Sequence, residues 1–356
     1  MRENMAMREL PVWYRRGSSL MVASLVTTMV CLVHAAPVQQ VHRLEAGPTT
    51  VAFGYYWSEA KPVLHIASGD IIDVDTMLTS SPNRLEAMGL PPDQVQQSLR
   101  EIYDQVAAED RGPGGHILTG PVYVEGAEPG DVLQVDVLEI DLPILYGYNG
   151  CSGFTRENCP EDRTDRSRLF WLDADNMTAD FAPGIVIPLD PFFGSMGVAP
   201  PADAGRWSSV PPWIHAGNID NQEMVAGTTL YIPIWVPGAL FEIGDGHAAQ
   251  GDGEVDQTAI ETALRGRLRL TVRKDMTLEW PVAETDTHWI VMGFDENLTE
   301  ATRITINQTI AFLSERFGLS RGEAYRLISL AIDLRITQLV DQKVGVHAMI
   351  PKEIFK

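Results

Sequence analysis

The stretch of sequence that decides the fold covers residues 228–254 and reads TTLYIPIWVPGALFEIGDGHAAQGDGE. Its first part is apolar and rich in β-branched and aromatic residues, which is typical of a buried strand. Its second part places three acids and one histidine among four glycines, which permit a tight turn. On extended backbone alternate side chains share a face, so Asp245 should align with His247, and Asp252 with Glu254. We therefore predict two acid-bearing arms, joined by HAAQ, that converge on one point.

A bound cation would explain such a convergence. Carboxylates together with an imidazole suit zinc or a similar divalent ion, whereas oxygen ligands alone would suit calcium. The stretch lacks the regular acidic spacing of a calcium loop, and His247 favours zinc. The alternative is an acidic hairpin whose Asp side chains hydrogen-bond to their own turn backbone. These residues alone leave both interpretations open.

Two further segments have a similar composition. In GGHILTGPVYVEGAEPGD, His116 precedes a predicted Thr-Gly-Pro turn and Glu125 follows a short strand. In HAGNIDNQEMVAGTTLY, Asn218 and Asp220 stand just ahead of the strand that leads into the acidic stretch. Each segment taken alone is also explained by turn chemistry, because Asn, Asp and Gly are common turn residues.

The rest of the pattern predicts a β-rich α+β fold. Short β-branched or alternating segments from residue 41 to 142 indicate strands, interrupted by one helix at PPDQVQQSLREIYDQV. Residues 146–212 are rich in Gly, Pro and Asp and predict long loops around short strands such as PGIVIPL. We divide the chain into a β-rich catalytic region over 36–257 and an α+β part over 258–356.

The C-terminal part is expected to contain strands covered by two helices. RGRLRLTVRKDM predicts a pair of strands, and HWIVMGF predicts another strand. The first helix should end at Gly318, and the second should span SRGEAYRLISLAIDLRITQLV, where Ser320 and Glu323 form a capping box.

The N-terminus resembles an export signal. Residues 1–35 show a basic segment, a 14-residue apolar run from Leu20 to Val33 and small residues for cleavage. This run is short for a membrane span, so we expect an exported protein without stable membrane association, the alternative being a retained anchor. Cys151 and Cys159 would then remain as a disulfide or as two free thiols. The net charge of −21 makes nucleic acid a poor partner.

Several other catalytic arrangements find no support in the sequence. It contains no G-x-S-x-G nucleophile elbow, phosphate-binding glycine loop or dinucleotide fingerprint. A cysteine nucleophile would require an unpaired thiol, which export disfavours.

Four segments resemble the acetamidase/formamidase family of short-chain amide hydrolases. They are TGPVYVEGAEPGDVLQVDV, FFGSMGVAP, GNIDNQEMVAGTTLYIPIWVPGALFEIGDGHAAQGDGE and TDTHWIVMGFDENL, and the resemblance extends from about residue 50 to the C-terminus. It implies a β-sandwich-like part, a barrel-like part and an α+β tail. It also implies hydrolysis of small primary amides to a carboxylate and ammonia, and a homo-oligomer. The family pattern falls on His116, Glu125, Asn218, Asp220, Asp245, His247, Gln250, Asp252 and Glu254.

From the residues and the resemblance together we expect metal-assisted amide hydrolysis. The candidate metal ligands are His116, Asp220, Asp245 and His247, with zinc as the expected ion and calcium as the alternative. The candidate bases that take the proton of the attacking water are Glu125, Asp252 and Glu254. The candidate substrate-binding residues are Asn218, Gly197 and Gln250, with backbone N–H groups of GSMG as a possible oxyanion site.

Two other functions are compatible with the sequence. One is hydrolysis of a larger amide on the same scaffold, which a panel of amides of rising size would distinguish. The other is a non-enzymatic exported module in which the acidic turns hold a structural ion. Candidate polar residues at three separate places favour catalysis, since a structural ion needs only one such cluster.

Overall fold

The computed structural model describes residues 39–162 and 166–356. The predicted export signal over 1–35 lies outside these residues. Within the described part of the chain, no helix is both long and apolar enough to cross a lipid bilayer.

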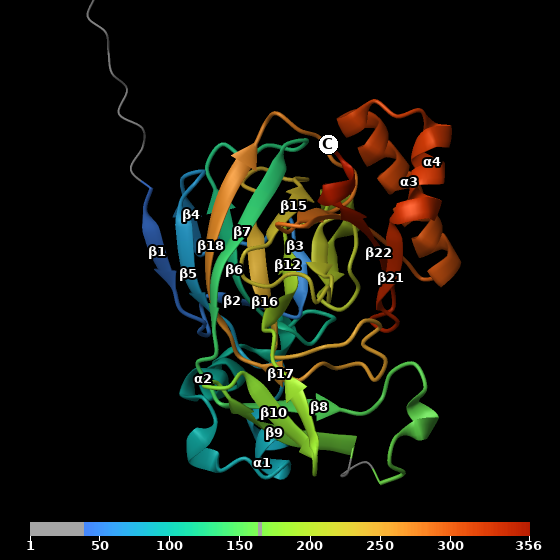
Figure 1. Ribbon diagram of the computed structural model, residues 1–356. Coiled ribbons are helices and arrows are strands. Elements are labelled where there is room, and N and C mark those ends of the chain that lie inside the picture. The colour runs from blue at the N-terminus through green and yellow to red at the C-terminus, as the bar shows by residue number, and fades with distance from the viewer. Residues whose placement is uncertain (1–38, 163–165) are drawn as a thin grey trace, which may run out of the picture. The chain divides into compact units, whose positions relative to one another are not determined.

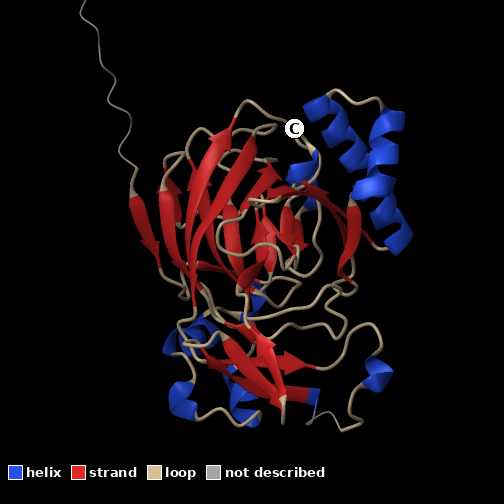
Figure 2. Ribbon diagram, viewed as in Figure 1, coloured by secondary structure: helices blue, strands red, loops and turns tan. Residues whose placement is uncertain are grey.

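Most of the strands belong to two large sheets (Figures 1 and 2). In the described residues the first sheet contains β1 (Val41–Leu44), β5 (Ile71–Asp75), β7 (Val132–Asp141), β15 (Thr229–Pro233), β18 (Arg265–Arg273), β19 (Val282–Glu284), β20 (His288–Asp295), β21 (Asp333–Gln338) and β22 (Val344–Pro351). Their order is β1-β5-β18-β7-β15-β19-β20-β22-β21. All the pairings are antiparallel except that of β1 with β5.

The second sheet carries the acidic stretch. It contains β2 (Val51–Phe53), β4 (Leu64–Ile66), β6 (Ile117–Val124), β8 (Tyr146–Gly150), β9 (Ser167–Asp173), β10 (Thr178–Ala182), β11 (Ile185–Pro188), β12 (Phe192–Gly197), β14 (Ala216–Asn218), β16 (Phe241–His247) and β17 (Glu261–Thr262). Its main order is β11-β10-β9-β8-β17-β16-β12-β14, and β6 joins β16 to β2 and β4. A separate pair is formed by β3 (Tyr55–Trp57) and β13 (Arg206–Ser208).

The two large sheets share one apolar core. Val135 of β7 and Leu268 of β18 belong to the same buried cluster as Phe193 of β12 and Phe241 and Ile243 of β16. Each of these five side chains is 0% exposed. A core built from faces of two sheets is sandwich-like, which agrees with the predicted β-rich fold.

Four α-helices occur in the described residues: α1 (Pro82–Ala87), α2 (Gln97–Gln105), α3 (Leu298–Phe317) and α4 (Arg321–Ala331). Short 3₁₀ helices lie at Pro92–Gln94, Ala108–Asp110, Arg156–Asn158, Ala202–Ala204 and Lys352–Ile354. Figure 1 shows α3 and α4 beside β21 and β22, so helices cover the C-terminal strands as predicted.

The helix ends follow the predicted signals. Gly318 ends α3 in the left-handed conformation, with φ of 67°, and its N–H group donates to the carbonyl of Ser314. Ser320 and Glu323 form the predicted capping box at the start of α4. The sequence-based prediction was therefore correct about where α3 ends and where α4 begins.

Three local predictions were wrong. RGRLRLTVR forms the single strand β18, not a strand pair. The predicted Thr-Gly-Pro turn lies inside β6, which is continuous from Ile117 to Val124. The second C-terminal helix ends at Ala331, and the residues that follow form β21. The first sheet spans the expected boundary after residue 257, because β18 pairs with both β5 and β7.

Cys151 and Cys159 are joined by a disulfide in the structure. The bond closes the loop that follows β8. Of the two alternatives that the sequence left open, the structure contains the disulfide.

Candidate active site

Strand β16 brings Asp245 and His247 to one side of a buried cavity of about 140 Å³. Their side chains meet as the alternation predicted, with Asp245 Oδ2 3.2 Å from His247 Nε2. Asp245 is 3% exposed and His247 is 1% exposed. Asp245 and His247 therefore point into the protein, whereas the predicted alignment of Asp252 with Glu254 does not occur, because Glu254 is buried and Asp252 pairs with Arg335 outside the cavity.

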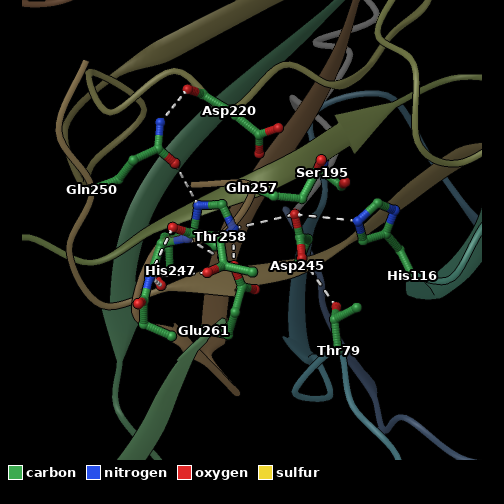
Figure 3. A network of polar contacts seen from close by, with 12 residues as sticks. Thr79, His116, Ser195, Asp220, Asp245, His247, Gln250, Gln257, Thr258 and Glu261 are labelled. Atoms are coloured by element: carbon green, nitrogen blue, oxygen red, sulfur yellow. Dashed lines mark hydrogen bonds and ion pairs between the residues drawn. The ribbon is translucent and has the colours of Figure 1, made fainter. Parts of the chain in front are cut away.

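His116 approaches Asp245 from a different strand. It precedes β6, which pairs with β16, and its Nε2 lies 3.8 Å from Asp245 Oδ2. Figure 3 shows His116 and His247 on either side of Asp245. Thr79 also reaches this carboxylate, because its hydroxyl donates to Oδ1 at 3.0 Å.

The hydrogen bonds of His247 determine which ring nitrogen carries a proton. The amide nitrogen of Gln250 donates to the carbonyl of Asp220 at 2.7 Å, so its Oε1 faces Nδ1 of His247 at 2.9 Å. Because an amide oxygen can only accept, Nδ1 must donate. Nε2 then carries either a second proton or a lone pair, and it faces Asp245 and Glu261 without a hydrogen bond of its own.

The same reasoning applies to His116. Its Nδ1 lies 3.0 Å from the backbone carbonyl of Ser209, which can only accept a hydrogen bond. Nδ1 therefore donates, and Nε2 is directed toward Asp245. Histidines that donate Nδ1–H to an oxygen and present Nε2 to a shared point are typical of metal ligands.

Glu261 completes this side of the cavity. Strand β17 pairs with β16 so that Glu261 lies opposite His247, and its Oε1 is 3.4 Å from His247 Nε2. Asp245, His247 and Glu261 each offer one ligand atom, all within 4.8 Å of one another. A second such group is formed by Asp220, His247 and Glu254. Both groups of side chains could hold a metal ion.

Five carboxylates line the cavity in the described residues: Asp220, Asp245, Glu254, Glu261 and Asp341. All five are buried, with at most 7% of the residue exposed. One oxygen each of Asp220 (Oδ1), Glu254 (Oε2) and Asp341 (Oδ2) is buried without a hydrogen-bond partner among the described residues. Buried charged groups are normally paired or bound to metal, so these oxygens point to a ligand.

The electrostatics of the cavity divide the carboxylates into two kinds. Burial and the neighbouring acids raise the pKa of Asp220 and of Glu254 well above their usual values, and burial raises that of Asp341 to about 6. Burial alone would also raise the pKa of Asp245, but His116, His247 and the hydrogen bond from Thr79 hold it below its usual range. Asp245 therefore stays ionised while the others favour a proton or a cation.

Backbone strain accompanies four of these acids. Asp220, Asp245, Glu254 and Asp341 have positive φ values of 45°, 55°, 39° and 60°. For residues other than glycine this region costs roughly 1–2 kcal/mol each. Strain of this kind concentrates at functional sites, where the rest of the fold maintains it.

Gly194 lets the backbone approach this cluster closely. A Cβ at this position would lie 2.5 Å from Asp220 Oδ1 and 2.8 Å from Asp245 Oδ2. No side chain fits there without moving a carboxylate, so the glycine of FFGSMG shapes the space between these two acids.

Most of the predicted site residues lie together. His116, Asn218, Asp220, Asp245 and Glu254 line the cavity. His247 and Gln250 lie directly behind it, connected by the hydrogen bonds shown in Figure 3. The amide of Asn218 donates to Asp220 Oδ2 at 2.6 Å, so it orients a cavity carboxylate.

Three predicted site residues lie elsewhere. Glu125 follows the far end of β6 from His116, is exposed and pairs with His65. Asp252 points outward and pairs with Arg335 at 2.5 Å. Gly197 lies between Ala216 and Glu242 in the sheet, so the GSMG backbone is engaged in strand pairing. The expectations of Glu125 and Asp252 as bases and of Gly197 at the substrate therefore conflict with the geometry.

Two site residues were missed by the sequence analysis. Glu261 is a single acid in the apolar segment AIETAL, and a lone acid in such a context can indicate a buried charge. Asp341 lies in the turn between β21 and β22, where an acid is unremarkable in the sequence. The sequence around Glu261 therefore contained a usable signal of a buried acid, whereas the sequence around Asp341 did not.

Comparison with known proteins places the chain in a family. The model of the Acetamidase/Formamidase family matches residues 84–207 and 202–356. The chain belongs to this family. Acetamidases and formamidases are amidases, which hydrolyse the carbon–nitrogen bond of linear amides.

Individual relatives agree with the family assignment. A formamidase of Methylophilus methylotrophus is 28% identical over 317 residues, covering 68% of this chain and 77% of the relative. The crystal structure of an acetamidase from Bacillus halodurans has a TM-score of 0.73 at 28% identity, covering 88% of this chain and 98% of the relative. That of an acetamidase from Yersinia enterocolitica has a TM-score of 0.74 at 27% identity, with 91% and 96% covered.

Proposed function

We propose that this protein hydrolyses a small primary amide, of the formamide or acetamide type, to a carboxylate and ammonia. Membership in the acetamidase/formamidase family supports the reaction class. The observation that carries the site is the pair of imidazole Nε2 atoms that flank Asp245, each with its Nδ1 tied to an oxygen acceptor.

We also propose that these residues bind a divalent metal ion, with zinc favoured by the mixed nitrogen and oxygen donors. The side chains fit such an ion. Asp245 and Glu261 lie 3.2 and 3.4 Å from His247 Nε2, close to the about 3.3 Å expected between neighbouring ligands of tetrahedral zinc with bonds of about 2.0–2.1 Å. Asp245, His247 and Glu261 would hold the ion, and His116 approaches Asp245 from the other side, with its Nε2 3.8 Å from Oδ2. When bound, the ion supplies Lewis-acid polarisation of the amide carbonyl.

Glu254 is the base best placed for the proton transfers. Its Oε2 is buried, lacks a partner in the described residues and faces the cavity. This oxygen takes a proton from the attacking water as the new carbon–oxygen bond forms. It then returns the proton to the amide nitrogen as the carbon–nitrogen bond breaks and ammonia leaves. Its raised pKa suits a group that holds a proton between these two steps.

The remaining carboxylates recognise the amide group. Asp220 Oδ1 and Asp341 Oδ2 are buried acceptors without partners in the described part of the chain. A primary amide brings two N–H donors that can satisfy such acceptors. A site that buries unpaired acceptors discriminates against molecules that lack the donors.

The test is ammonia release from formamide, acetamide and propionamide by the purified protein, before and after chelation and return of zinc. We expect release that falls on chelation and recovers with the ion. Metal analysis should show bound zinc in the wild type and little in His247→Ala, which removes one proposed ligand. Release that chelation does not change would overturn the metal, and no release from any of the three would overturn the function.

A matched control separates the site from the protein surface. Glu125→Gln removes an exposed carboxylate that lies outside the cavity, so its metal content and ammonia release should equal those of the wild type. A large loss in this variant would contradict the placement of the site.

We further propose that the protein is exported. The pattern of residues 1–35 and the disulfide between Cys151 and Cys159 support this proposal. Mass spectrometry of protein recovered outside the cytoplasm should show a chain that begins near residue 36. A full-length chain confined to the cytoplasm would contradict it.

A further inference from the structure

A second, larger cavity adjoins the buried one. Its volume is about 740 Å³, against about 140 Å³ for the cavity that holds the carboxylates. Glu254 and Thr258 line both cavities. Gln250, which bonds to His247, lines the larger one. The proposed base therefore stands at the junction between the two spaces.

The wall of the larger cavity is strongly apolar on the side of β9, β10 and β11. Phe170, Phe181, Ile187 and Leu189 line it from these strands and the segment after them, and Ile260 lines it from the residue before β17. The rings of Phe170 and Phe181 are stacked, with centroids 6.3 Å apart and planes 17° apart. These side chains provide a continuous surface for an apolar group.

The charged residues that line this cavity are all acids, while two arginines lie just outside the lining: Arg335 pairs with Asp252, and Arg168 lies over the Phe170 and Phe181 rings. Asp190, Asp252 and Asp256 line the cavity together with Glu254, and no Arg or Lys of the described residues does. A substrate that carries a carboxylate would be repelled here by Asp190, Glu254 and Asp256. The walls thus favour an uncharged apolar group over an anionic one.

The volumes of the two cavities indicate which part of a substrate each cavity could hold. The smaller cavity has the volume of about four or five liquid waters, enough for an amide group with a short acyl chain. The larger one falls within the roughly 300–1,000 Å³ typical of small-molecule sites. We infer that, among the primary amides it hydrolyses, the protein prefers one with an uncharged apolar acyl group larger than acetyl, which places its amide beside Glu254 and its acyl group against the β9–β11 wall. This inference rests on the proposed amide hydrolysis.

The first experiment measures kcat/KM for acetamide, butyramide, hexanamide and phenylacetamide. Each added methylene that enters the apolar cavity should raise kcat/KM by about fourfold, the effect of burying one CH₂ group. The kcat/KM for phenylacetamide should exceed that for acetamide by a factor similar to that of the longer aliphatic amides. If acetamide is turned over and kcat/KM stays level or falls with chain length, this inference is overturned while the proposed function stands. If no amide releases ammonia, both are overturned.

Two matched pairs of variants locate the acyl group. Ile187 lines the cavity and its neighbour Val186 does not, because adjacent strand residues point to opposite faces. Ile187→Ser should lower kcat/KM for hexanamide by about tenfold and leave acetamide unchanged, whereas Val186→Ser should change neither. The second pair is Phe181→Ala, with Trp171→Ala as its control, since both side chains are exposed but only Phe181 lines the cavity.

The variants also exclude a purely structural effect. Loss of hexanamide turnover in both members of a pair would mean that strands β9–β11 only support the fold, or that a second copy of the chain covers them. Either result would overturn the inference. A selective loss in Ile187→Ser and Phe181→Ala would place the acyl group in this cavity.

Discussion

The acidic side chains of the first sheet and those of the buried cavity are neutralised differently. On the sheet, Asp73 receives two hydrogen bonds from Arg265, at 2.6 and 2.7 Å, and Glu139 pairs with Arg267 at 3.2 Å. These arginines come from β18, which runs beside β5 and β7. The basic face that the sequence shows on RGRLRLTVRK thus matches acids on the neighbouring strands.

The cavity contains no such match. Five carboxylates of the described residues line it, and none of the described lining residues is an Arg or a Lys. Among the described residues, His116 lines the cavity and His247 lies directly behind it, each with Nδ1 tied to an oxygen acceptor. The same chain that pairs its surface acids leaves its buried ones without a fixed cation. This difference supports the proposal that the buried acids bind a cation from outside the chain.

The largest effect should separate two acids that stand two residues apart. Glu254→Gln removes the proposed base and should lower kcat for ammonia release by about 10²–10⁴-fold. Asp252→Asn changes an acid that points outward to Arg335, so kcat should stay within about threefold of the wild type. Steady-state kinetics with acetamide measures both. Equal losses in the two variants would break the distinction between cavity and surface acids.

Removal of the metal gives the next largest effect, on stability. Chelation leaves the cavity carboxylates facing one another, and we expect the free energy of unfolding to fall by about 3–4 kcal/mol relative to zinc at 100 to 1,000 times its Kd. Denaturant unfolding with and without chelator measures the difference.

A charge-neutral variant sharpens this test. Glu261→Gln removes one of the buried charges. With chelator present, the variant should therefore have a larger free energy of unfolding than the wild type, but addition of zinc should raise that free energy by less. The opposite ranking would show that the carboxylates do not repel one another in the metal-free protein.

Part of this site could be predicted from local sequence. Asp245 and His247 share a face because they alternate on one strand, and that relation needs no knowledge of the rest of the fold. Gly318, Ser320 and Glu323 likewise mark helix ends through contacts within a few residues. Such features depend on neighbours along the chain.

The errors have a common physical origin in strand pairing. Glu261 faces His247 only because β17 pairs with β16, a relation that the sequence of β17 does not contain. The resemblance placed Glu125 among the candidate bases, and Thr-Gly-Pro was interpreted as a turn. In the structure β6 continues through Gly120 and Pro121, which carries Glu125 to the opposite end of the strand. Residues that depend on pairing between distant segments could not be placed from sequence alone.

A smaller effect concerns a buried group with no role in the reaction. His215 is 0% exposed, neither ring nitrogen has a partner in the described residues, and burial lowers its pKa to about 3. In the unfolded chain a histidine binds a proton below pH about 6.5. Between pH 6.5 and 3 the unfolded state thus binds more protons, so stability falls as the pH drops, by at most about 1.4 kcal/mol per pH unit from this residue.

His215→Phe tests this assignment. It removes the titrating group and keeps the ring that packs edge-on against Tyr56. The dependence of unfolding free energy on pH between 6.5 and 5 should become shallower by up to that amount, while stability at pH 7.5 stays equal or rises. An unchanged slope would show that His215 is already protonated in the folded protein.

The smallest effect should come from the paired acids of the sheet. The side chains of Asp73 and Arg265 are 16% and 43% exposed, so their attraction is screened by water despite its two-point geometry. A double-mutant cycle with Asp73→Asn and Arg265→Gln should give a coupling of about 0.2–1 kcal/mol, reduced further in 1 M salt, with ammonia release unchanged. A coupling above about 2 kcal/mol would mean that the sheet pairs are as strongly desolvated as the cavity. The contrast between acids paired within the chain and acids kept for an external cation would then no longer follow from their burial.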